Sequence, residues 1–178
     1  ERGRSMAPFW IAGSLGFAAL AMFLVQGAEA PRQDDMSKPG MEVQASAEIQ
    51  EAQAALQADP HDLAALNTLT HFALLQGDLQ VAMQHFQSVQ LVAPRAKEVV
   101  AHGAARAILV NMADRALPAL EQLRTEEPAF AEGHWWMAVG LVRSGELDVA
   151  REHLEIALKL DPKGEMGMLA RDMLQRLD

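Results

Sequence analysis

The sequence predicts an all-α protein made of repeated helical hairpins, preceded by one apolar segment. Pro60, Pro94, Pro128 and Pro162 follow one another at intervals of 34 residues, so one period holds over more than half of the chain. A period of this length is typical of stacked helix–turn–helix units. In front of this array, residues 5–28 contain no charged side chain, which indicates a membrane span.

The residues between these prolines repeat with the same period. Seventeen positions before a proline stand Gly77, Asn111 and Gly145, the residue types that tolerate a positive φ at a helix end. Each unit is therefore expected to contain two helices joined at this position. Small residues and large apolar residues also recur at fixed places, as expected where helices approach closely and where ridges fill grooves. These are Thr70, Ala104 and Ala138, then Ala82, Ala116 and Ala150, then Phe86, Leu120 and Leu154.

This spacing resembles the tetratricopeptide repeat (TPR) family. The resemblance covers three full repeats at residues 63–96, 97–130 and 131–164, with flanking helices at residues 46–58 and 165–177. The sequence departs from the family pattern where an early aromatic residue is usual, because Leu66, Val100 and His134 stand there. The resemblance implies a solenoid domain over residues 46–178 that binds other proteins and catalyses no reaction.

Residues 5–28 are long enough to cross the ~30 Å hydrocarbon core of a membrane as a helix. Arg2 and Arg4 precede this segment and acidic residues follow it. The positive-inside rule therefore predicts a cytoplasmic N-terminus and a TPR domain on the other side, which is the periplasm if the membrane is a bacterial inner membrane. Residues 29–45, with their prolines and charges, read as a flexible tether.

Two features of the apolar segment allow further interpretations. A small-x-small motif at residues 28–30 is compatible with a cleaved signal peptide, although the apolar run exceeds the ~7–15 residues usual for one. Ala12, Gly16 and Ala19 lie near one face of the predicted helix, where they could pack against another membrane span. An uncleaved anchor is the interpretation that the length favours.

Composition excludes several classes of function. The chain carries 15 Lys and Arg against 24 Asp and Glu, a net charge of −9, which disfavours nucleic acid as a partner. It has no cysteine, which excludes disulfides, thiolate metal sites and covalent haem attachment through cysteine. None of the six histidines pairs at the i, i+4 spacing of a helical metal site, and no phosphate-binding loop is present. The sequence thus predicts no enzyme, no cofactor and no metal, with carboxylates on solvated helix faces.

In proteins that resemble this one, the first helix of each repeat lines a concave groove, and this implies a mostly apolar binding surface. Trp135 is the expected anchor of a partner peptide, with Trp136 in the core, and Arg143 could pair with a carboxylate. The competing interpretation is a groove filled internally, in which the helix at residues 46–58 or the tether covers some of these residues. The predicted lining is Asn67, His71, Leu74 and Leu75, then Ala101, Ala105, Ile108 and Leu109, then Trp135, Val139, Val142 and Arg143.

The hypothesis that follows is a membrane-anchored TPR scaffold that holds a partner protein or peptide in its groove and helps to assemble a membrane or periplasmic complex. The order of anchor, tether and repeats is similar to that of TPR assembly factors in bacterial cytochrome c maturation. The alternative is a structural accessory subunit that is held permanently in a membrane complex through its span.

Overall fold

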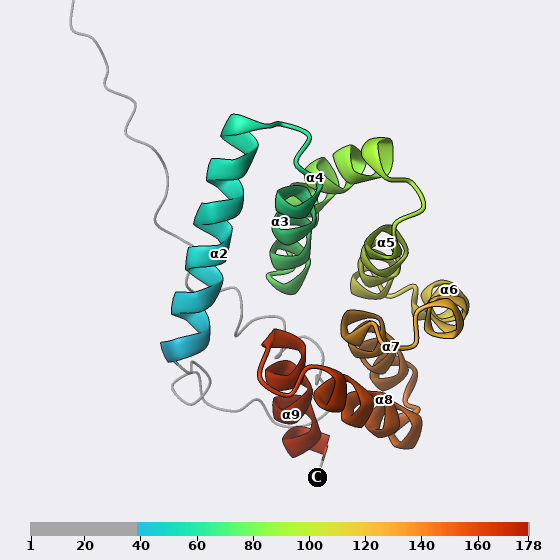
Figure 1. The fold of residues 1–178 in the computed structure, drawn as a ribbon. Coiled ribbons are helices and arrows are strands. Elements are labelled where there is room, and N and C mark those ends of the chain that lie inside the picture. The colour runs from blue at the N-terminus through green and yellow to red at the C-terminus, as the bar shows by residue number, and fades with distance from the viewer. Residues whose placement is uncertain (1–38, 178) are drawn as a thin grey trace, which may run out of the picture.

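The structure of the protein is a computed structural model that describes residues 39–177, and this part of the chain is entirely helical, without a strand. The predicted all-α fold is therefore confirmed for the described residues. The helices, coloured along the chain in Figure 1, are α2 (Pro39–Ala58), α3 (Leu63–Leu75), α4 (Leu79–Val92), α5 (Lys97–Leu109), α6 (Ala113–Glu126), α7 (Ala131–Ser144), α8 (Leu147–Leu160) and α9 (Glu165–Leu177).

Three helical hairpins form the body of the domain. Helix α3 packs on α4, α5 on α6, and α7 on α8, while α2 packs on α3 and α9 packs on α8. The first helices of the hairpins also contact one another, α3 with α5 and α5 with α7. Figure 1 shows that the array follows a curved path, so that α9 returns toward the lower end of α3. This is the TPR-like arrangement that the 34-residue period predicts.

The turns inside the hairpins have the predicted geometry. Gly77, Asn111 and Gly145 have φ of 73°, 62° and 82°, so all three adopt the left-handed conformation that ends a helix and redirects the chain. In the first repeat, Asp62 and Asp78 cap α3 and α4, each accepting a hydrogen bond from the backbone N–H three residues on. The hairpin geometry is thus determined by residues close in sequence.

The residues that recur with the period form the contacts between helices. All of the repeated small and large apolar residues named above are buried. Ala104 and Ala138 belong to one continuous core that runs from α3 to α9, and Trp136 is fully buried in it. The small side chains let neighbouring helix backbones approach, while the large ones fill the space between them.

The N-terminal side differs from the prediction in one respect. Helix α2 begins at Pro39 and not at residue 46, so residues 39–45 of the predicted tether are helical. Proline suits the first position of a helix, where its missing N–H has no intrahelical partner in any case. None of the helices described here is both long and apolar enough to cross a membrane. The predicted span at residues 5–28, with Ala12, Gly16 and Ala19, lies outside the described residues.

Candidate functional site

The predicted apolar groove is not an open surface. The buried members of its predicted lining are Leu74, Leu75, Ala101, Ala105, Ile108, Trp135 and Val139, and all of them belong to the core between the helices. Trp135 is only 3% exposed, so its prediction as the anchor of a partner peptide is wrong. The physical reason is that α7 is enclosed by α5, α6, α8 and α9, which leaves no apolar face for a partner.

The other predicted residues are half-buried. Asn67 and His71 line a common pocket, whereas Leu109 and Val142 pack against the core. Arg143 donates a hydrogen bond to Asn111 Oδ1 at 2.5 Å and does not line that pocket. The prediction that Arg143 pairs with a partner's carboxylate therefore gains no support from its position.

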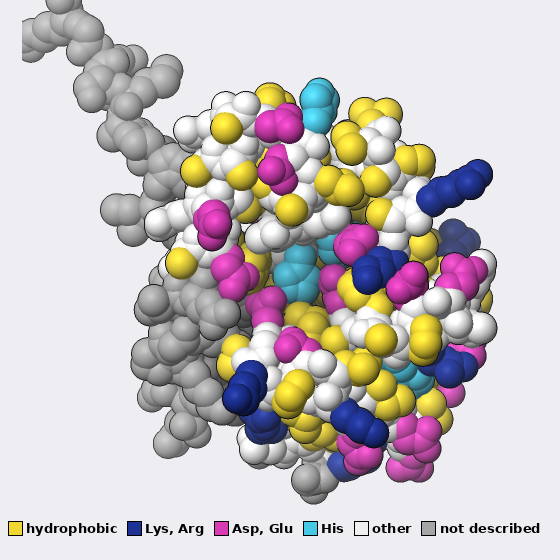
Figure 2. Space-filling view, viewed as in Figure 1, with side chains coloured by type: hydrophobic (Ala, Val, Ile, Leu, Met, Phe, Trp, Pro, Cys, Tyr) yellow, Lys and Arg dark blue, Asp and Glu magenta, His cyan; other side chains and the backbone are white. Residues whose placement is uncertain are grey.

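The concave side instead contains a polar, acidic pocket of about 290 Å³. Figure 2 shows histidine and acidic side chains gathered in the hollow at the centre of this face. Among the described residues, the lining has five carboxylates and two imidazoles, with no Lys or Arg. The lining residues are Glu48, Asn67, Thr68, His71, Phe72, Glu98, His102, Glu132, Asp161, Glu165 and Met166.

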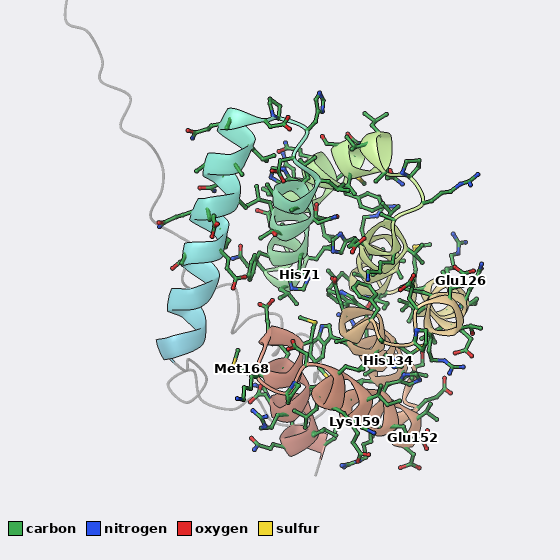
Figure 3. The ribbon with its side chains drawn as sticks, viewed as in Figure 1. His71, Glu126, His134, Glu152, Lys159 and Met168 are labelled. Carbon is green, nitrogen blue, oxygen red and sulfur yellow. The ribbon has the colours of Figure 1, made fainter. Side chains whose placement is uncertain are left out.

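One carboxylate oxygen is the centre of this pocket's hydrogen bonding. Glu132 Oε1 accepts hydrogen bonds from His71 Nδ1 at 2.8 Å, His102 Nε2 at 3.1 Å and Trp136 Nε1 at 3.2 Å. On its other side, His71 donates from Nε2 to Glu165 Oε2 at 2.8 Å. These side chains come from α3, α5, α7 and α9, and Figure 3 shows His71 at the end of α3 that faces α9. We call His71, His102, Glu132 and Glu165 the concave cluster.

The local structure explains how these groups meet. Glu132 and Glu165 lie in the first turns of α7 and α9, where a carboxylate is stabilised by the positive end of the helix dipole. His71 and His102 lie on the first helices of neighbouring repeats, and α3 packs directly on α5. Because the array curves, the start of α7 and the start of α9 both come within reach of α3.

His71 and Glu132 of the concave cluster are charged although their side chains are only 13% exposed. Burial alone would lower the pKa of His71, but the charges of Glu132 and Glu165 and their hydrogen bonds raise it to about 10. Burial would raise the pKa of Glu132, yet the charge of His71 and the hydrogen bonds from both histidines hold it well below its usual range. At neutral pH, His71 is therefore an imidazolium between two carboxylates.

Sequence reasoning missed most of this cluster for two reasons. The i, i+4 spacing of metal ligands applies within one helix, whereas His71 and His102 lie on separate helices. Glu132 was expected on a solvated face, but its side chain is only 13% exposed. The signal present in the sequence is that both histidines lie in the first helices of adjacent repeats, three positions apart in register.

A second pair of histidines lies between α7 and α8. His134 Nδ1 and His153 Nδ1 are 3.0 Å apart, and His134 Nε2 lies 3.1 Å from the carbonyl oxygen of Pro128. Since that carbonyl only accepts, His134 carries its proton on Nε2, and Nδ1 of His134 accepts from Nδ1–H of His153. Burial lowers the pKa of both residues, and Arg124 on α6 contributes to this. Both imidazoles are therefore neutral; we call them the histidine pair.

Comparison with protein-family models and with curated protein sequences gives no match. Among solved structures, the crystal structure of MamA is similar to this chain, with a TM-score of 0.44 and 17% sequence identity. The similarity covers 74% of this chain and 77% of that chain. The fold and the site described above rest on the helices and side chains of this chain itself.

Proposed function

We propose that this protein is a scaffold that binds a partner protein, and that a Lys or Arg side chain of the partner enters the acidic pocket. Arrays of stacked helical hairpins generally act through such protein contacts. The observation that carries the proposal is the lining of the pocket, to which residues 39–177 contribute five carboxylates and no basic side chain other than the histidines. The apolar groove expected from the sequence is closed, so polar recognition takes its place.

The charge of the pocket favours a cation. The imidazolium of His71 neutralises one carboxylate, and the remaining acidic groups leave the pocket negative at neutral pH. A partner ammonium or guanidinium group would balance this charge and donate hydrogen bonds to carboxylate oxygens. A partner carboxylate would be repelled, so the recognition of an acidic chain terminus is excluded by the sign of the charge.

Site-specific photocrosslinking in cells tests this proposal. A photoreactive residue at Thr68, in the lining of the pocket, is expected to crosslink a partner protein. The same residue at Leu91, which is 86% exposed and outside the pocket, is expected to give no such product. Charge reversal by Glu98→Lys should abolish the Thr68 product without changing the helix content of the protein. Equal crosslinking from both positions, or a product that persists in Glu98→Lys, would contradict the proposal.

We further propose that residues 5–28 anchor the scaffold in a bacterial inner membrane, with the TPR domain in the periplasm. What supports this is the uncharged length of the segment and the two arginines before it. Deletion of residues 5–28 should move the protein from the membrane fraction to the soluble fraction. Protein that remains in the membrane fraction after this deletion and a high-salt wash would contradict the anchor.

The order of anchor, tether and repeats supports a role in assembling a membrane or periplasmic complex, including the maturation of c-type cytochromes. Cells that lack the protein should then lose haem-stained periplasmic cytochromes, and normal staining would remove this narrower proposal.

The alternative is an accessory subunit held through its span. Recovery of the same partners by Glu98→Lys, but not by the chain without residues 5–28, would favour that alternative.

A further inference from the structure

The floor of the pocket holds three donor atoms of the kinds that bind transition metals. His71, His102 and Glu132 each offer one ligand atom, and these atoms all lie within 4.8 Å of one another. In a tetrahedral zinc site, metal–ligand distances of ~2.0–2.2 Å place neighbouring ligand atoms about 3.3 Å apart. The two separations from Glu132 Oε1, 2.8 Å to His71 and 3.1 Å to His102, are already close to this value.

The surroundings of His71 match those of a metal ligand. Histidines that bind metal almost always donate their other ring N–H to a carboxylate or a carbonyl, which orients the ring. His71 does so, because Nε2 donates to Glu165 Oε2 at 2.8 Å and this leaves Nδ1 directed toward Glu132. Glu165 thus acts as a positioning residue on the side of the imidazole that faces away from Glu132.

We propose that His71 Nδ1, His102 Nε2 and Glu132 Oε1 bind a divalent transition-metal ion of the zinc type at the floor of the acidic pocket. Two imidazoles and one carboxylate are a ligand set that suits Zn²⁺ and leaves a fourth coordination position for another ligand. Neutral imidazole with an unprotonated ligating nitrogen is the form that binds metal, so the ion takes the place of two hydrogens. The proton on His71 Nδ1 is released to solvent, and the hydrogen on His102 Nε2 is exchanged for one on His102 Nδ1, so both imidazoles are neutral in the metal-bound state. This inference concerns a ligand other than the partner protein and does not depend on the proposed function.

Two further oxygens of the pocket lack a donor. Glu165 Oε1 and Asn67 Oδ1 are buried, line the same pocket, and have no hydrogen-bond partner among the side chains and backbone of residues 39–177. Buried acceptors of this kind normally have a donor. A cation bound in the pocket together with its waters would supply such donors.

Calorimetric titration of the full chain with ZnCl₂, after removal of metal by a chelator, tests the inference. Wild-type protein is expected to bind a single Zn²⁺, and Mg²⁺ at the same concentration should not compete, because it prefers oxygen ligands. Glu165→Gln should weaken Zn²⁺ binding roughly 10–100-fold, the usual effect of changing a residue that positions a metal ligand. His71→Gln should weaken it further.

A histidine outside the pocket supplies the matched control. His134→Gln changes a residue that is 4% exposed, about as buried as His102, so it reports on nonspecific effects of altering a buried imidazole. It should leave Zn²⁺ affinity unchanged. In a second measurement that does not depend on variants, Co²⁺ bound to wild-type protein should show the visible absorption of a tetrahedral site with nitrogen and oxygen ligands.

Several results would overturn the proposed metal site. The site would be overturned by absence of Zn²⁺ binding to the wild type, or by unchanged affinity in folded His71→Gln and Glu165→Gln proteins. An octahedral Co²⁺ spectrum, or equal weakening by His134→Gln, would also overturn it. Because no partner protein is present in these titrations, their failure leaves the crosslinking test of the proposed function intact.

Discussion

The two histidine clusters use the same side chain in opposite charge states. In the concave cluster, His71 lies between Glu132 and Glu165, and its pKa is raised to about 10. In the histidine pair, His134 and His153 face each other, and burial lowers the pKa of both. All of these imidazoles are largely removed from water, so burial does not explain the difference. What decides the charge state is whether a carboxylate lies within hydrogen-bond distance of the ring.

The two clusters are neighbours in sequence on α7. Glu132 and His134 are two positions apart, which places them roughly 200° apart around a helix of ~3.6 residues per turn. Glu132 therefore faces α3 and α5, while His134 faces α8. Helix α7 thus carries a charged carboxylate on the face toward the pocket and a neutral imidazole on the face toward α8. Four experiments test this contrast.

The largest loss of stability is expected when Glu132, the shared hydrogen-bond acceptor of the concave cluster, is replaced. Glu132→Gln leaves the buried His71 cation with one carboxylate and weakens the hydrogen bonds of His102 and Trp136. Breaking a buried charge pair from one side typically costs ~3–5 kcal/mol, so we expect a loss of about 3 kcal/mol in the free energy of unfolding. Urea denaturation at pH 7 measures it. The exposed Glu152→Gln serves as control and should change stability by less than about 0.5 kcal/mol.

The second effect is a loss of stability at alkaline pH. Native His71 holds a proton up to about pH 10, whereas unfolded histidine releases it near pH 6.5. Between these values the native state binds more protons, so the free energy of unfolding falls as pH rises, by up to a few kcal/mol. Urea titrations of metal-free protein at a series of pH values should show this slope. His71→Gln should flatten it, and a slope that persists in this variant would disprove the assignment.

The third expected effect is a loss of stability at acidic pH, and it comes from the histidine pair. Native His134 and His153 bind protons more weakly than unfolded histidines, so their contribution to stability is present above pH ~6.5 and is lost as pH falls below it. Protonation would place two N–H groups against each other, beside Arg124, with Glu121 as the opposing charge. The double variant His134→Leu, His153→Leu should be less sensitive to acid than the wild type. Equal acid sensitivity would show that other groups cause the loss.

The smallest loss of stability is expected from changing Glu165, the second carboxylate of the concave cluster. Glu165→Gln keeps an oxygen that accepts from His71 Nε2 but removes its charge, so we expect a loss of roughly 1 kcal/mol in unfolding free energy. Nuclear magnetic resonance titration of the ring should show a lower pKa for His71 and unchanged values for His134 and His153. A shift in the histidine pair would mean that the two clusters are coupled.

The fold follows largely from sequence because its signals are local and repeated. The left-handed conformations of Gly77, Asn111 and Gly145 were predicted from their residue types and positions, and the structure confirms them. The start of α2 was not predicted, because the proline and glycine at residues 39 and 40 read as loop, although the first position of a helix accepts proline.

The site was mostly not predictable, because it depends on contacts between repeats. Trp135 was expected in an open groove, but the packing of α7 against its neighbours buries it. His71 was predicted in the groove lining and lies in the acidic pocket. Nothing in its sequence neighbours indicates Glu132 or Glu165, which are 61 and 94 positions away. Such pairings depend on the curvature of the array, which sums small rotations at each helix contact.

The period, the helices, the hairpin turns and the buried small residues could all be predicted from the sequence, since each depends on a backbone preference or an apolar pattern within one repeat. Which polar groups meet depends on the tertiary structure. The start of α7 reaches α3 only when three hairpins have stacked, and only then do two carboxylates hold the proton of His71. Charge states depend on neighbours in space, and a linear pattern does not contain those distances.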